Sequence, residues 1–194
     1  MAKKILVLAG KRVGFETLSY LFSIGAPIEH VIIGSRDDVE LITLVSEKEC
    51  SYDFMSSKLQ EEYIAENTSY EWILSLWNPA ILKSKFLDLG KNKLNLHPSL
   101  VPNCRGNDTA AWTIRKGLAA GVSLLDMNEG IDTGGVYTQK EVTYSLVESG
   151  KSLFEKLQLE LISLFIDSWV DIYNGKIVPK PQKGSVTYHD RKQT

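Results

Sequence analysis

The segment ILVLAGKRVGFETLSYLFSIGAPIEHVIIG, residues 5–34, decides the fold. Its first five residues form a continuous apolar run, which is typical of a strand buried on both faces of a parallel sheet. After a predicted loop at residues 10–14, apolar side chains recur at helical spacing until Gly25 ends the helix. A second apolar run follows at residues 28–33. Strand, helix and strand in this order form a βαβ unit, which predicts an α/β protein with a doubly wound, mostly parallel sheet.

The rest of the chain predicts further elements of the same kind. Residues 37–67 are polar and mostly helical in composition, with a break near Ser51. Short patterns predict a helix at 109–116 and strands at 72–77, 94–97, 122–127 and 136–142. A long amphipathic helix begins after Ser149, the expected N-cap, and stops at Gly175. We therefore expect one domain over residues 1–175, followed at 176–194 by a tail or short hairpin.

The composition limits the classes of function. Of the 194 residues, 43% are hydrophobic and 24% are charged, which indicates a globular protein and excludes a disordered one. The formal net charge of −2 argues against a nucleic-acid partner bound by bulk electrostatics. No apolar run reaches the about 20 residues that a membrane helix needs, and no export signal is recognised, so we expect a cytoplasmic protein. Cys50 and Cys104 have no metal-ligand spacing, and we expect no metal.

Three polar side chains lie at or just after the carboxyl ends of predicted strands. Asn95 and His97 are two residues apart on one strand, so both side chains leave the same face near its carboxyl end. Asp132 lies in a glycine-containing loop, residues 128–135, after another strand. Open α/β sheets bind ligands at these strand ends, so an amide, an imidazole and a carboxylate can meet there. The alternative is a purely structural histidine.

Two motifs carry a resemblance to a known family. NLHPSLVPNCRG at 95–106 and GVSLLDMNEGIDTGGVYTQ at 121–139 together resemble the formyltransferases that use N10-formyltetrahydrofolate. The resemblance implies a Rossmann-like formyltransferase fold. It also implies a catalytic trio, which maps onto Asn95, His97 and Asp132. In such a site an amide and a protonated imidazole stabilise the oxyanion, while a carboxylate orients the imidazole and assists proton transfer.

The resemblance also implies where the formyl donor binds. Its pteridine would lie against two loops, which contain Trp77, Asn78, Pro79, Ile81, Leu82, Asn128, Glu129, Gly130 and Ile131. For the side chains of Trp77, Ile81 and Leu82, core packing is an equal alternative. Leu125 stands where the family often has histidine, outside the trio.

Within the family, the sugar N-formyltransferases fit best. Residues 10–14 lack the phosphate-binding pattern of glycinamide ribonucleotide transformylase, and we expect no RNA-binding domain of the transfer-RNA enzymes. The IDTG loop, the helix start at 149–157 and the segment Thr187–His189 resemble the sugar branch. The implied reaction formylates the amine of a nucleotide-linked amino sugar, such as a dTDP- or GDP-4-amino-4,6-dideoxyhexose, for surface polysaccharide such as O-antigen.

Candidate contacts to this substrate are Lys11, Arg12, Ser99, Arg105 and Gly106. Lys11 and Arg12 lie near a helix amino terminus, where a diphosphate can bind, although simple solvation is the alternative. Ser99 is expected to be a loop or substrate contact and not a nucleophile. The resemblance suggests a homodimer. A transformylase acting on glycinamide ribonucleotide and a catalytically silent folate- or nucleotide-binding module stay open as alternatives. A generic dinucleotide-binding domain is disfavoured because GxGxxG is missing after the first strand.

Overall fold

The computed structural model describes residues 4–145 and 147–189. The chain forms two compact units, Met1–Asn95 and Leu96–Thr194. The strand β5 (Gly90–His97) contributes its first six residues to the first unit and its last two to the second.

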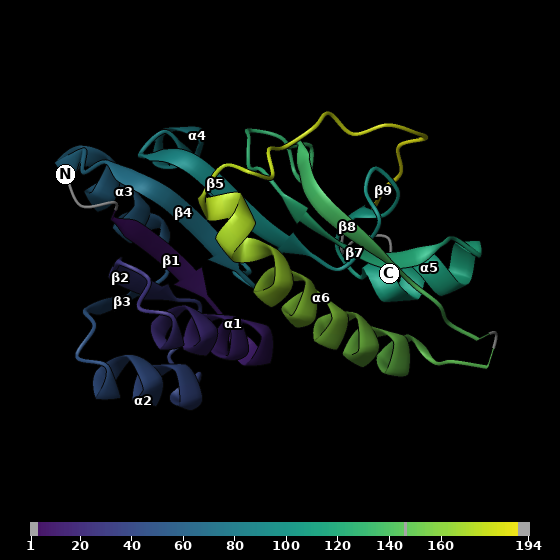
Figure 1. Ribbon diagram of the computed structural model, residues 1–194, viewed down its shortest axis with the longest axis horizontal. Helices are drawn as coiled ribbons and strands as arrows, with labels where there is room; N and C mark the ends of the chain where they lie inside the picture. Colours follow the sequence, from purple (N-terminus) through teal and green to yellow (C-terminus); the bar gives the residue numbers. More distant parts are fainter. Residues whose placement is uncertain (1–3, 146, 190–194) are drawn as a thin grey trace. The chain divides into compact units, whose positions relative to one another are not determined.

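The first unit is a parallel sheet with helices on both faces. Its elements are β1 (Ile5–Ala9), α1 (Lys11–Ser23), β2 (Ile28–Ile33), α2 (Val39–Glu47), β3 (Tyr52–Phe54), α3 (Ser57–Glu66), β4 (Tyr70–Leu76), α4 (Ser84–Leu87) and β5. The strands pair in parallel in the order β3-β2-β1-β4-β5. In Figure 1, α1 and α2 cover one face of this sheet, while α3 and α4 cover the other. This arrangement confirms the predicted α/β class with a mostly parallel, doubly wound sheet.

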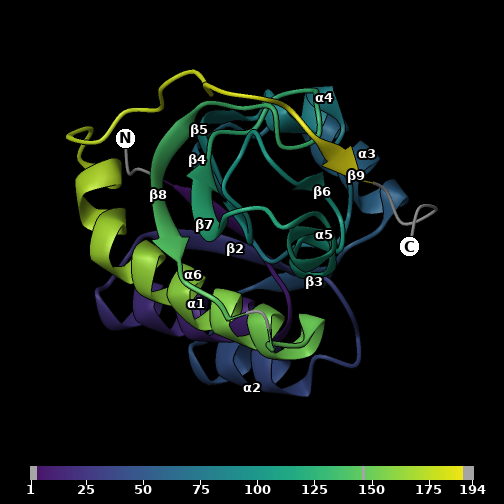
Figure 2. The ribbon, with the colours of Figure 1, turned by 90° about the vertical axis from the view of Figure 1, so that its right-hand side faces the viewer.

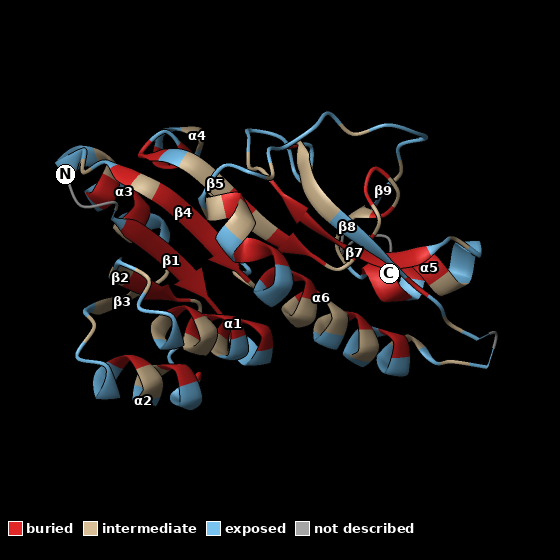
Figure 3. Ribbon diagram, viewed as in Figure 1, coloured by how far each residue is buried: buried red, intermediate tan, exposed pale blue. Residues whose placement is uncertain are grey.

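The register brings the carboxyl ends of neighbouring strands to one edge. Ala9 at the end of β1 is level with Ile33 of β2 and with Leu76 of β4. Ser75 of β4 pairs with Asn95 of β5. Figure 3 shows that β1 is buried along its length, as its continuous apolar run predicts. The loops that follow these strands therefore emerge together at the edge where α/β sheets bind ligands.

One expectation for this unit was wrong, and one short strand was not predicted. Residues 11–14 are not a loop, because α1 already begins at Lys11. Gly14 lies inside the helix for a packing reason: a Cβ there would come within 2.8 Å of the Leu76 carbonyl oxygen. The polar stretch 37–67 contains, besides two helices, the short strand β3, which three residues are too few to reveal by periodicity.

The second unit combines an antiparallel strand pair with two helices. Its further elements are β6 (Arg105–Gly106), α5 (Thr109–Lys116), β7 (Ala120–Leu125), β8 (Val136–Val142), α6 (Gly150–Tyr173) and β9 (Tyr188–His189). β7 and β8 pair antiparallel, and α6 packs against β7, β8 and α5. In Figure 3, α6 is buried along one side, which carries the predicted row of leucines and aromatic residues. Ser149 caps α6 by accepting a hydrogen bond from Ser152 N at 3.1 Å, as expected.

The segment after α6 is tied to this unit at two places. Lys180 forms an antiparallel bridge with Val136 of β8, with hydrogen bonds of 2.9 and 2.7 Å. Further along, β9 pairs in parallel with β6, and Figure 2 shows it beside β6 and α5. The predicted long helix and short tail are both present. Across the described ranges, no helix is long and apolar enough to span a membrane.

Gly14→Ala should destabilise the protein by about 1–3 kcal/mol, because the added methyl group forces α1 away from the end of β4. Gly150→Ala is the matched control: it also lies in a helix, but its Cβ would meet nothing nearer than Ala111 Cα at 3.9 Å. Urea unfolding of both variants gives the comparison. Equal stability of the two variants would contradict this packing account.

Candidate active site

His97 is the most constrained of the predicted catalytic side chains. It ends β5, only 4% of it is exposed, and its Nε2 lies 3.0 Å from the carbonyl oxygen of Cys104. A carbonyl oxygen only accepts hydrogen bonds, so Nε2 carries the proton and donates. The other nitrogen, Nδ1, lies 3.4 Å from Oδ2 of Asp132. The structure thus brings His97 and Asp132 together within the second unit, and both ring nitrogens face acceptors.

Asp132 is fixed from its side chain as well as its backbone. The Gly106 N–H donates to Asp132 Oδ2 at 2.9 Å, and Asp132 adopts a left-handed φ of 52°. Gly106 itself has φ of 91°, and a Cβ there would fall 2.1 Å from the carbonyl oxygen of His189. Only glycine therefore allows β6 to approach β9 and present this N–H. Gly106, predicted as a substrate contact, is here a hydrogen-bond partner of the Asp132 carboxylate.

The turn between Ser99 and Cys104 is held by internal hydrogen bonds. Ser99 is buried, and its hydroxyl hydrogen is shared between the carbonyl oxygens of Asn103 and Cys104, at 3.0 and 2.9 Å. Of the two roles expected for Ser99, this geometry matches the loop contact. Burial raises the pKa of the Cys104 thiol, which keeps it protonated and a poor nucleophile. Cys104 contributes to the site through its carbonyl oxygen.

The segment after α6 supports the same turn. Thr187 Oγ1 accepts from Cys104 N at 2.8 Å, and the Thr187 carbonyl accepts from Arg105 N at 3.0 Å. Arg105 donates from Nε and Nη2 to Oε1 of Gln182, at 3.1 and 2.7 Å. Two of the guanidinium donors that were expected to meet substrate are therefore engaged within the protein.

The second donor-binding loop predicted from sequence is exposed. Asn128, Glu129, Gly130 and Ile131 all reach solvent. Asn128 Oδ1 accepts hydrogen bonds from Gly130 N at 3.1 Å and from Thr133 Oγ1 at 2.5 Å, which gives the loop its turn. Its backbone is thus shaped before any ligand binds.

In the first unit, Asn95 and the loop after β4 occupy strand ends. Asn95 is half-buried on β5, two residues before His97. Trp77 adopts φ of 68°, and Asn78 closes a turn by donating from Nδ2 to Ala80 O at 2.8 Å. Ile81 is 76% exposed, whereas Trp77 and Leu82 are half-buried. None of the three apolar side chains is fully buried.

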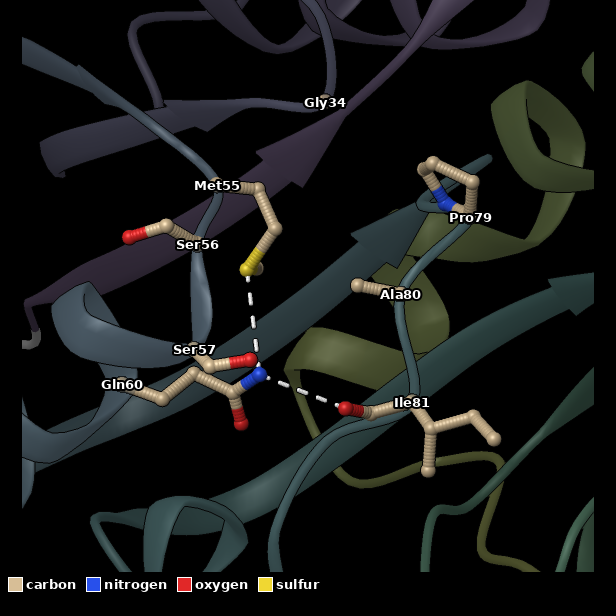
Figure 4. Close-up of a pocket in the computed structure, with 8 residues that line it drawn as sticks. All are labelled: Gly34, Met55, Ser56, Ser57, Gln60, Pro79, Ala80 and Ile81. Carbon is tan, nitrogen blue, oxygen red and sulfur yellow. Dashed lines mark hydrogen bonds between the residues drawn. The ribbon is translucent and has the colours of Figure 1, made fainter.

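Sequence reasoning missed Gln60, which holds this loop from α3. Only 4% of Gln60 is exposed; its Nε2 donates to Ile81 O at 3.2 Å, and its Oε1 accepts from Lys83 N at 2.9 Å. Figure 4 shows the amide turned toward Ile81 and the Met55 sulfur. A glutamine on the buried face of an otherwise polar helix was the available signal.

A pocket of about 490 Å³ opens beside Gln60. It is lined by Gly34, Met55, Ser56, Ser57, Gln60, Pro79, Ala80 and Ile81, which follow the carboxyl ends of β2, β3 and β4. Pro79 and Ile81 were predicted as site residues, whereas the remaining lining residues were not. The pocket therefore adjoins the predicted donor loop.

Lys11 and Arg12 stand at the amino terminus of α1, with exposed side chains. The backbone N–H of Lys11 donates to Oδ2 of Asp38 at 2.6 Å. Asp38 is largely buried, so an anionic group of the chain already occupies this helix end. A diphosphate here would meet the two side chains and not this N–H group.

The match to a family model places the chain among known proteins. The model described as "Formyl transferase" matches residues 38–167, which include both motifs. The chain belongs to the formyl transferase family. It is 36% identical over 110 residues to a methionyl-tRNA formyltransferase from Thermodesulfovibrio yellowstonii, covering 56% of this chain and 36% of that protein. It is 28% identical over 160 residues to a GDP-perosamine N-formyltransferase from Brucella melitensis, covering 76% and 62%. The matches thus span less than two thirds of either relative.

The fold of this formyl transferase also matches solved structures. The N-formyltransferase from Helicobacter canadensis, in complex with folinic acid and dTDP-3-aminofucose, superimposes with a TM-score of 0.81 at 20% identity. The match covers all of this chain and 72% of that one. At this identity the likeness establishes the formyltransferase fold.

Gln60→Glu should loosen the loop after β4, because a carboxylate cannot donate to Ile81 O and places a second oxygen against it. We expect amide hydrogen exchange over residues 80–83 to rise by about tenfold or more. Glu61→Gln is the control, since it removes only the exposed ion pair from Lys83 Nζ to Glu61, at 2.7 Å. Unchanged exchange in Gln60→Glu would show that the amide does not hold the loop.

Proposed function

We propose that this chain transfers a formyl group from N10-formyltetrahydrofolate to the amine of a nucleotide-linked amino sugar. A 4-amino-4,6-dideoxyhexose carried on dTDP or GDP, destined for surface polysaccharide, is the expected acceptor. The match to the GDP-perosamine N-formyltransferase over 160 residues supports this choice, together with the resemblance of residues 149–157 and 187–189 to the sugar branch. Methionyl-tRNA formyltransferases match over a similar length, 162 residues in one case, so the test below includes their acceptor. A homodimer, which the resemblance implies, and the cytoplasmic location expected from the sequence both stay predictions.

The chain's own residues suit the formyl donor. Trp77, Ile81 and Leu82 offer apolar surface outside the core, which matches a flat heteroaromatic ring. The backbone of the 128–131 loop offers exposed polar groups for the ring edge. These two loops would hold the donor, which supplies the formyl group and a nitrogen leaving group when bound.

His97 and Asn95 would stabilise the negative charge that develops on the formyl oxygen. With Nε2–H donating to Cys104 O, His97 would donate to the formyl oxygen from Nδ1, so the ring would carry a proton on both nitrogens when it acts. The carboxylate of Asp132, 3.4 Å from Nδ1, would stabilise this charged ring. Asn95 would donate from its side-chain amide. One such donor is typically worth about 10²–10³ in rate. The His97 ring is already oriented by its hydrogen bond to Cys104 O, so it would need little reorganisation during the reaction.

Asp132 would act on the proton of the attacking amine. Its carboxylate keeps the His97 ring oriented at 3.4 Å and can accept, directly or through water, the proton that the amine loses as its bond to the formyl carbon forms. It would then return this proton to the departing nitrogen. General acid–base catalysis of this kind contributes about 10²–10⁴ in rate. No covalent bond to the enzyme is needed, which is consistent with the buried Ser99 and Cys104.

Cationic side chains would meet the diphosphate. Lys11 and Arg12 are exposed at the start of α1 and carry the charge that a diphosphate requires. Arg105 would contribute the guanidinium donors that Gln182 does not take. These assignments concern binding of the acceptor and not the chemical step.

His97→Asn tests the proposal. We expect the wild-type protein to add a formyl mass to one amino sugar in a panel of dTDP- and GDP-linked 3- and 4-amino sugars, measured by mass spectrometry. His97→Asn should lower kcat by about 10²-fold or more, with KM for the formyl donor within a few-fold. His30→Asn in the first unit is the matched control and should keep near wild-type kcat.

The panel also includes glycinamide ribonucleotide and methionyl-tRNA. If either of these acceptors is turned over faster than every amino sugar, that acceptor, and not an amino sugar, is the substrate. Donor binding without turnover on any amine would favour the catalytically silent module. A largely active His97→Asn variant would contradict the role given to His97.

A further inference from the structure

We propose that Gln182, in the segment after α6, is a positioning residue for the Asp132 loop. Its Nε2 donates to the carbonyl oxygens of Asp132 and Gly134, at 2.8 and 2.7 Å. Its Oε1 accepts from two nitrogens of Arg105. The inference rests on the proposed function, in which Asp132 is catalytic. It makes the segment after α6 part of the active site.

The two ends of the Gln182 amide are matched to their surroundings. Carbonyl oxygens only accept and a guanidinium only donates, so the amide nitrogen must face the loop and the oxygen must face Arg105. Both amide hydrogens and the oxygen are used. A glutamate at this position keeps the acceptor for Arg105 but has no hydrogen for the two carbonyl oxygens. The arrangement therefore requires an amide.

Gln182 binds the main chain of Asp132, whose backbone conformation is unfavourable. Asp132 has φ of 52°, a left-handed conformation that is unfavourable for a residue with a side chain. Gln182 fixes the main chain at this strained position and two residues after it, while Gly106 N holds the carboxylate at 2.9 Å. Without the two carbonyl contacts the loop can relax, and Asp132 Oδ2 can leave its place 3.4 Å from His97 Nδ1.

The segment that carries Gln182 is itself anchored on both sides. Two residues before Gln182, Lys180 pairs with Val136. Five residues after Gln182, Thr187 binds the turn at Cys104. Ordering the glutamine therefore costs little additional entropy, because the backbone around it is already fixed. The His97 turn and the Asp132 loop are both held by this one segment.

Gln182→Glu separates positioning from general stabilisation. We expect kcat to fall by about 10²-fold or more, with KM for donor and acceptor within a few-fold, because the reacting groups are misplaced and the substrate contacts remain. Arg105→Met releases the other end of the amide and should lower kcat much less. Amide hydrogen exchange should rise over residues 130–135 in Gln182→Glu.

Asn92→Asp is the matched control. Asn92 Nδ2 donates to the carbonyl oxygen of Glu71 at 3.1 Å and to Glu71 Oε1 at 3.4 Å, so this amide-to-acid substitution removes comparable hydrogen bonds without touching the His97 turn or the Asp132 loop. It should lower the melting temperature about as much as Gln182→Glu while keeping kcat within a few-fold.

A Gln182→Glu variant with kcat within threefold of wild type would overturn the proposal (threefold being about 0.7 kcal/mol in barrier). A loss of kcat equal to that of Asn92→Asp at equal melting temperature would also overturn it. Hydrogen exchange keeps the two proposals apart. If the wild-type protein transfers no formyl group yet exchange over 130–135 rises in Gln182→Glu, the positioning contact stands and the proposed function fails.

Discussion

The hydrogen bond from His97 Nε2 to the carbonyl oxygen of Cys104 fixes the geometry on which the candidate active site depends. The ring is buried, so an unmet donor or acceptor there would cost about 1–3 kcal/mol, and the bond is correspondingly hard to break. It sets the tautomer and the ring orientation, and it leaves Nδ1 directed toward Asp132. The Cys104 carbonyl is in turn held by the Ser99 hydroxyl, while Thr187 holds the neighbouring N–H.

Three hydrogen bonds hold the pair formed by His97 and Asp132, and in each of them one partner is a main-chain group. The carbonyl of Cys104 holds the imidazole, the N–H of Gly106 holds the carboxylate, and the amide of Gln182 holds the backbone of the Asp132 loop. Backbone groups move less than side chains, so such a site is preorganised for charge that develops during a reaction. The same device recurs in the first unit, where Gln60 holds the main chain of the loop after β4.

Much of the fold was predictable because it depends on local periodicity. The run at Ile5–Ala9, the helix that Ser149 caps and the strand ending at His97 all show their pattern within a few residues. Asp132 and His97 were recognised from motifs, which record residue types at fixed spacing. Gln60 and Gln182 could not be found in this way, because a glutamine's role depends on which carbonyl and N–H groups from distant segments face it. Gly14 was misread as a loop marker, since its need for close packing against Leu76 is a tertiary contact.

The most direct test of this account is the tautomer of His97, measured by ¹⁵N NMR of histidine-labelled protein. The chain has three histidines, and a His97→Gln variant identifies the signal. The account predicts that the proton of the neutral ring is on Nε2, because Nε2 donates to the Cys104 carbonyl. A neutral ring with its proton on Nδ1 and a bare Nε2 would contradict the account, because that ring cannot make the hydrogen bond that orients His97.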